Sequence, residues 1–280
     1  MIGHEADIRA ILNRRHGGGA DYWATDDGRI YVGNPYSTLS SLAMLHELGV
    51  RADHEAVAGG LALVLDACRP DGRIRVGPGA PMYPCYTAEA ARVLCRFGYS
   101  DDARVLHTVS YLVDNAHASG GWRCDYRRFG RGPETEFANP GATLYVLDVL
   151  RFFPTDRDAR GVIDAAVDSL LRHWEVRVPT GPCHRGIGSR SQRVEFPFLR
   201  YNLFYYVYVL SFYERARRDD RFGAALDALD AKLDQAGRVV VESRHRGLSG
   251  LRFCATGRPS DLATRRYGEI RQNLEAQGAG

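Results

Sequence analysis

The amino-acid sequence predicts an all-α protein in which helices pair into about five hairpins and the hairpins close into a ring. Three observations predict this fold. Amphipathic helical patterns alternate with more apolar ones. A short glycine turn followed by an apolar, strand-like piece recurs in the loops, at 26–32, 70–76, 119–124 and 235–241. The helices after the turns start roughly 50 to 60 residues apart, a spacing that suits helical pairs with a long connecting loop.

The first helix of each expected pair is amphipathic and carries most of the charge, as a helix on the outside of a ring should. The expected ranges are 5–14, 54–68, 101–115, 156–174 and 219–234. Asp101, Asp156 and Asp219 stand at the start of three of these helices, where a negative charge is favourable to the helix dipole.

The second helix of each pair is apolar around most of its circumference, which indicates a helix packed on both sides. The expected ranges are 37–48, 87–97, 142–152, 202–213 and 261–275. Short turns join each second helix to the next first helix, whereas the loops inside each pair are long and rich in glycine and proline. The long loops should therefore share one face of the ring, and loops on a rigid scaffold commonly carry the functional groups.

Composition limits the choice of function. The chain has 280 residues, 45% hydrophobic and 25% charged, and its even repetition predicts one domain over 1–280. Its net charge is +3, and Lys232 is its only lysine among 37 basic residues, so the arginine bias indicates GC-rich codons rather than nucleic-acid binding. We expect no transmembrane segment and a cytoplasmic location, because the N-terminus lacks a signal peptide's apolar run.

Three cysteines from three separate repeats, and the histidine that follows one of them, are expected on the loop face. Thiolate and imidazole groups are the ligands that zinc prefers, and a mononuclear site needs three or four of them. The sequence therefore predicts a zinc site formed by all or three of Cys85, Cys124, Cys183 and His184. The alternative is that the cysteines are buried in the core and that the histidine is solvated or hydrogen-bonded.

Other polar and aromatic residues are expected around the mouth of a central cavity. A glutamate near thiols and tyrosines could act as a general acid or base if burial raises its pKa. The candidate catalytic residues are Glu195, Tyr86 and Tyr201, and the candidate substrate-binding residues are Tyr36, Asn139, Trp122 and Asn202. The alternative is helix capping for the two asparagines and structural packing for the tyrosines and the tryptophan.

The glycine turns and the segment Cys85-Tyr86-Thr87, which opens a second helix, resemble the repeats of the prenyltransferase and squalene-cyclase superfamily over residues 22 to 275. The resemblance implies an α/α toroid. In protein prenyltransferase β subunits an Asp, a Cys and a His bind zinc, and Cys85 matches that cysteine. Tyr83 stands where the family has the aspartate, and no DxDD motif of class II terpene cyclases occurs. The pair Cys183-His184 is also similar to zinc ligands of lanthionine cyclases.

The expected function is that of a prenyltransferase-like or terpenoid cyclase-like enzyme. It would bind a largely apolar small molecule in a central cavity, with zinc as the cofactor of a transfer or cyclisation reaction. Two alternatives remain. One is a metal-free cyclase that uses Glu195 and the tyrosines, and the other is a non-catalytic module that binds a small molecule or a partner.

Overall fold

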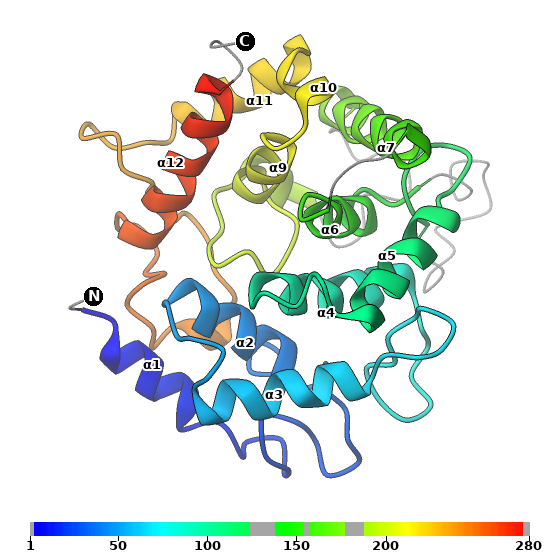
Figure 1. Ribbon diagram of the computed structural model, residues 1–280. Helices are drawn as coiled ribbons and strands as arrows, with labels where there is room; N and C mark the ends of the chain where they lie inside the picture. The colour runs from blue at the N-terminus through cyan, green and yellow to red at the C-terminus, as the bar shows by residue number, and fades with distance from the viewer. Residues whose placement is uncertain (1–2, 124–137, 154–156, 177–187, 277–280) are drawn as a thin grey trace. The chain divides into compact units, whose positions relative to one another are not determined.

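A computed structural model describes residues 3–123, 138–153, 157–176 and 188–276 (Figure 1). Over these residues the protein is all-α, with eleven α-helices, two 3-10 helices and no strand, so the predicted fold class is confirmed. The expected strand-like pieces are isolated β-bridges, such as Cys68 with Ile74 and Leu233 with Val239. The residue contacts divide the chain into two compact units. The closed ring and the single domain stay predictions.

The first unit comprises Met1–Asp114 and His245–Cys254. Its helices are α1 (Glu5–Leu12), α2 (Thr38–Glu47), α3 (Glu55–Asp66), α4 (Pro84–Arg96), α5 (Ala103–Asp114) and the 3-10 helix η3 (Arg246–Leu248). Helix α2 packs against α1, α3 and α4, and α4 also packs against α3 and α5. Both α2 and α4 are therefore buried on most sides, as the sequence predicts for second helices.

The separate segment 245–254 is fastened to α1 by one buried carboxylate. The backbone N–H groups of Arg252 and Phe253 each donate to Asp7 over 2.8 Å. Asp7 is only 3% exposed. The two hydrogen bonds therefore offset the free-energy cost of removing its carboxyl group from water. The N-terminal helix and a segment far along the chain thus belong to one unit.

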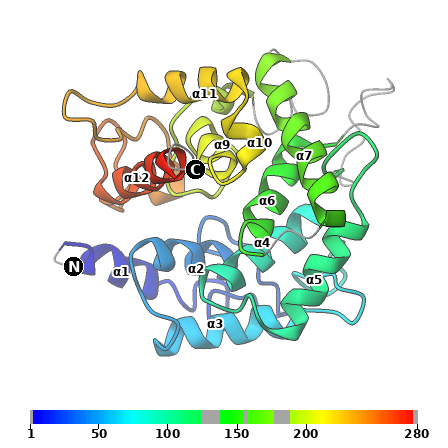
Figure 2. The ribbon, with the colours of Figure 1, turned by 45° about the horizontal axis from the view of Figure 1, so that its top comes forward.

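The second unit comprises Asn115–Arg244 and Ala255–Gly280. Its helices are α6 (Pro140–Leu150), α7 (Arg157–Val176), η2 (Gly188–Gln192), α9 (Leu203–Leu210), α10 (Glu214–Arg217), α11 (Asp220–Asp230) and α12 (Asp261–Glu275) (Figure 2). Helix α9 packs against α6, α11 and α12, and all eight of its residues are buried. The apolar circumference of this helix in the sequence is explained by that position.

The four glycine turns share one hydrogen-bond pattern. Each turn spans five residues and has a glycine at its fourth position. The N–H of the first residue donates to the carbonyl oxygen of the fifth, and the N–H of the glycine donates to the carbonyl oxygen of the first. The first residues are Thr25, Arg69, His117 and Asp234, and the glycines are Gly28, Gly72, Gly120 and Gly237. The φ angles of the glycines lie between 71° and 84°, a left-handed region that disfavours side chains. The sequence repeat is therefore also a structural repeat.

Three of the turns are fastened to the following helix by a threonine. The N–H of the residue just after the turn donates to the hydroxyl of the fourth helical residue, over 3.0–3.2 Å. The pairs are Ile74 with Thr87, Trp122 with Thr143, and Val239 with Thr264. In the first repeat, the fourth residue of α2 is Ser41, whose buried hydroxyl has no hydrogen-bond partner among the described residues. The N–H of Ile30 donates to the Val76 carbonyl instead.

Candidate functional site

A cleft of about 390 Å³ lies in the first unit, between two loops and the start of α4. We call it the tyrosine cleft. Most of its walls are apolar or aromatic. It is lined by Arg29, Tyr31 and Val32 from the first loop, Val76, Pro78, Gly79, Ala80 and Pro81 from the second loop, and Tyr86 from α4.

Three contacts shape this cleft. The bond from the Ile30 N–H to the Val76 carbonyl, 2.9 Å long, joins the two loops. The rings of Tyr31 and Tyr86 lie tilted against each other, with their centroids 5.0 Å apart. Tyr83 also packs against Tyr86, with the two ring centroids 5.5 Å apart. The aromatic wall is therefore held by its own packing, which is the usual preference of aromatic pairs.

A buried carboxyl group stands behind this wall. The Tyr31 hydroxyl donates to Oε2 of Glu89 over 2.9 Å, and the Glu89 side chain is 3% exposed. Burial raises the pKa of Glu89, although the nearby Arg92 guanidinium, 3.6 Å from Oε1, and the bond from Tyr31 act in the opposite direction. A carboxyl with a raised pKa can hold a proton where an ordinary one is ionised, which suits a general acid.

Tyr86 is the one candidate catalytic residue that lines the tyrosine cleft. Cys85, its neighbour on α4, is half-buried. The other expected zinc ligands, Cys124, Cys183 and His184, lie outside the described residues. Within the described ranges, no three His, Cys, Asp or Glu side chains come together as a metal site. Zinc binding at these four residues therefore stays a prediction.

Glu195 and Tyr201 lie in the second unit. Nε and Nη2 of Arg200 donate to the two carboxylate oxygens of Glu195 over 2.7 and 2.8 Å. The hydroxyl of Tyr201 lies 2.8 Å from Nδ1 of His173, and burial lowers the pKa of this histidine to about 4. The imidazole is thus neutral at pH 7. The catalytic roles of Glu195 and Tyr201 stay predictions.

The two candidate asparagines cap helices. The Asn139 side chain accepts the N–H of Ala142 at the start of α6, and Asn202 accepts the N–H of Tyr205 at the start of α9, each over 3.0 Å. This confirms the capping that the sequence allowed as an alternative. Trp122 is fully buried beside its turn. Substrate binding by these three residues stays a prediction.

Tyr36, the fourth candidate substrate-binding residue, is half-buried near the start of α2, outside the residues that line the tyrosine cleft. The guanidinium carbon of Arg14 lies 4.3 Å above the centre of its ring, a distance typical of a cation–π contact. A role for Tyr36 in substrate binding stays a prediction.

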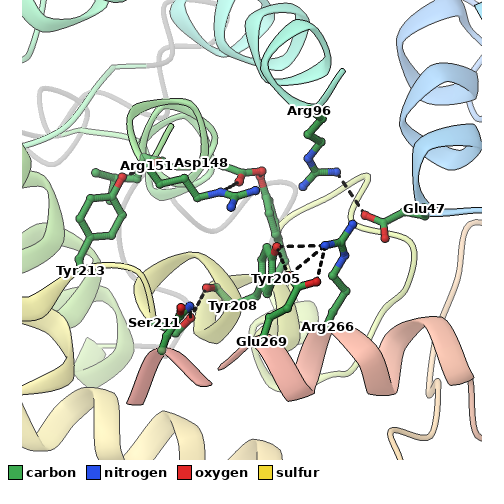
Figure 3. Close-up of polar contacts among 12 residues, drawn as sticks. Glu47, Arg96, Asp148, Arg151, Tyr205, Tyr208, Ser211, Tyr213, Arg266 and Glu269 are labelled. Carbon is green, nitrogen blue, oxygen red and sulfur yellow. Dashed lines mark hydrogen bonds and ion pairs between the residues drawn. The ribbon is translucent and has the colours of Figure 1, made fainter. Parts of the chain in front are cut away.

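Buried ion pairs, which no pattern in the sequence predicts, occur in both units. In the second unit, Asp148 accepts bonds from Tyr205 over 2.7 Å and from Arg151 over 2.6 Å (Figure 3). A half-buried carboxylate in the same unit, Glu269, accepts from Tyr208 over 2.7 Å and from Arg266. In the first unit, Arg96 pairs with Glu47 over 3.4 Å. Each of these charged groups has a partner, so we assign these residues a structural role rather than a catalytic one.

Tyr31 and Glu89 were also missed. The sequence did hold a signal for Glu89: it is a carboxyl group in the middle of a helix that is otherwise expected to be buried and apolar.

Comparison of the sequence with models of known protein families and with curated proteins finds no match. None of the helices in the described part of the chain combines the length and the apolar character needed to cross a bilayer.

Proposed function

We propose that this protein is an enzyme that binds a largely apolar small molecule in the tyrosine cleft and transfers a proton through Tyr31 and Glu89. One observation carries the proposal: a tyrosine that lines the cleft is hydrogen-bonded, over 2.9 Å, to a buried carboxyl. A perturbed acid beside a cleft is a common mark of an active site. The reaction class we favour is a proton-initiated cyclisation or transfer.

The cleft favours an apolar molecule. Its walls are formed by tyrosine rings, valines and prolines, and its volume of about 390 Å³ lies within the range of small-molecule sites. The resemblance of the sequence to prenyltransferases and squalene cyclases agrees with a substrate of this kind.

The proton can move in either direction between the two residues. When Glu89 is ionised, it accepts the Tyr31 hydroxyl proton, and the tyrosine oxygen can then remove a proton from a bound molecule. When Glu89 is protonated, it can donate to the tyrosine oxygen across the same contact. The Tyr31 hydroxyl then donates to a bound molecule, and Glu89 supplies the proton that replaces the one transferred. The raised pKa of Glu89 favours this second state.

Binding can be tested by calorimetry with geraniol and farnesol. Ala80 lines the cleft and is half-buried, so Ala80→Trp should fill the cleft and abolish binding. Ala58 is exposed on α3, and Ala58→Trp is the matched control that should bind normally. If Ala80→Trp binds these alcohols as well as the wild type does, the cleft is not the binding site.

Catalysis can be tested by mass spectrometry of apolar substrates after incubation. Tyr31→Phe keeps the ring and removes the hydroxyl, so we expect binding to persist and turnover to fall by about 100-fold or more. Tyr99 has the same chemistry away from the cleft, and Tyr99→Phe is the control. Equal turnover by both variants contradicts the proton-transfer role. Binding with no turnover by the wild type favours the alternative of a non-catalytic module.

A further inference from the structure

We infer that the molecule bound in the tyrosine cleft is a carboxylic acid, with an apolar body against the tyrosines and its carboxylate on Arg29. This inference rests on the proposed binding role of the cleft and adds the chemical class of the ligand. Among the described residues that line the cleft, Arg29 is the single charged one.

Arg29 differs from its equivalents in the repeat. Arg73 and Arg238 occupy the same position in their turns, and each pairs with an aspartate of its own turn. For Arg73 both Nε and Nη2 contact one oxygen of Asp71, over 2.9 and 2.5 Å. For Arg238 the two distances to the aspartate oxygen are both 2.9 Å. Each of these guanidinium groups directs one edge at its own carboxylate.

Only one nitrogen atom of the Arg29 guanidinium donates a hydrogen bond to the described residues. Its Nε donates to Asp27 over 2.7 Å, and its two Nη groups have no acceptor among the described residues. The side chain is 48% exposed, so the Nη groups are accessible. The residue therefore carries a paired donor edge that the fold itself does not use.

The stem of Arg29 is also held in place. A Cβ atom added at Gly77 would lie 2.6 Å from Cγ of Arg29, so the stem passes directly over the backbone of this glycine. Gly77 belongs to the second loop, next to Val76 in the cleft wall. The Asp27 contact fixes one side of the guanidinium, and the close approach to Gly77 fixes the stem.

The chemistry of the two Nη groups selects the ligand. They form a planar pair of donors, which matches the two oxygens of a carboxylate in a bidentate arrangement. The rest of the cleft offers apolar and aromatic surface. A molecule that satisfies both parts has one carboxylate and a compact apolar body, such as a branched or aromatic monocarboxylic acid.

Geranic acid and geraniol test this inference, because they share one carbon skeleton and differ in the charged group. Calorimetry at pH 7.5 should show that the wild type binds the acid about tenfold more tightly than the alcohol. Arg29→Gln should reduce the affinity for the acid by about the same factor and leave the affinity for the alcohol unchanged. Arg29→Lys, which keeps the charge without the planar pair, should give an intermediate loss.

Arg73→Gln is the matched control. It removes the arginine and its aspartate contact from the equivalent turn but lies outside the cleft, so both affinities should stay at the wild-type values. If the wild type binds both compounds equally, or if Arg29→Gln binds the acid normally, the inference is wrong and the apolar site stands. If the wild type binds neither compound, the cleft is not a site for apolar molecules, and the proposed function fails with it.

Discussion

The backbone N–H of Ile30 donates to the carbonyl oxygen of Val76, and this bond joins the two loops that form the tyrosine cleft. In three other repeats the equivalent N–H donates to a threonine of the following helix. Ser41 occupies that position in α2, and its hydroxyl is buried without a hydrogen-bond partner in the part of the chain that the structure describes. The cleft therefore lies where the first repeat departs from the pattern of the others. The Ile30 carbonyl still accepts a hydrogen bond from the Leu39 N–H of α2, whereas the Ile30 N–H binds the neighbouring loop.

The threonine contacts should contribute measurably to stability. Thr143→Val keeps the side-chain shape but leaves the buried N–H of Trp122 without an acceptor, and we expect a loss of about 1–3 kcal/mol in urea unfolding. Ser41→Ala removes a hydroxyl that has no partner, so its stability should stay within about 0.5 kcal/mol of the wild type or rise. Similar losses of stability in Thr143→Val and Ser41→Ala would contradict the stabilising role of the threonine contact.

Trp122 should be structural. Its ring is fully buried. The turn before it packs closely against α7, because a Cβ atom added at Gly120 would lie 2.4 Å from the carbonyl oxygen of Ala165. Trp122→Ala should cost about 3–5 kcal/mol, as truncation of a large buried aromatic residue does. The measurement is the melting temperature beside activity. Loss of activity at an unchanged melting temperature would show a role in substrate binding instead.

The sequence predicts the helices well because their signals are local. Helix α12 has the bounds expected from the apolar pattern, and Asn139 caps α6 as the alternative interpretation allowed. Helix α4 begins three residues earlier than expected, since Pro84 is favourable in the first turn. The short helix α10 was missed, because four residues do not complete enough turns to show a periodicity.

The candidate site was predicted only in part, because its contacts are not local. Tyr86 stands in a recognisable segment at the start of a helix, and it does line the cleft. Tyr31 and Glu89 are 58 residues apart, and their hydrogen bond arises when a loop packs on α4. No spacing in the sequence encodes that packing. The Nη pair of Arg29, which has no acceptor among the described residues, is also invisible in sequence, since the turn with Asp71, Gly72 and Arg73 repeats Asp27, Gly28 and Arg29 but makes different contacts.

His173 should make the protein less stable in mild acid. Burial lowers its pKa to about 4 in the folded state, from an ordinary value near 6.5, so folding favours the neutral ring. Its contribution to stability is complete above pH 6.5 and is lost as the pH falls from 6.5 through 4. The effect is at most about 3 kcal/mol. Urea midpoints at several pH values should fall less steeply for His173→Gln than for the wild type, and identical slopes would contradict this origin.

Glu89 should set the alkaline limit of the reaction. Its raised pKa means that the proton is retained above the pH at which an exposed glutamate ionises, and activity that needs the protonated form should decline as the pH rises through this pKa. Glu89→Gln cannot ionise, so the pH-dependent decline should disappear while the remaining rate is low. A pH profile that keeps the same decline in this variant would assign it to another group.

The zinc prediction needs a measurement of metal content. Cys85 lies at the start of α4, and the prediction joins it to Cys124, Cys183 and His184, which lie outside the described residues. We expect about one zinc ion per chain in protein made with zinc and never exposed to chelator, and clearly lower occupancy in Cys85→Ser and Cys183→Ser. Because thiolate ligands must be deprotonated, occupancy should also fall with the pH.

Cys68 provides the control for this experiment. It lies just after α3, hydrogen-bonded to the Val64 carbonyl, and burial raises the pKa of its thiol to about 11. A thiol that resists ionisation is a poor zinc ligand, so Cys68→Ser should keep the zinc content of the wild type. If wild-type protein contains no stoichiometric metal, or if all three serine variants lose it equally, the four residues do not form the site. Cys85 is then a packing residue of α4 beside the tyrosine cleft, and proton transfer through Tyr31 and Glu89 stands independently of it.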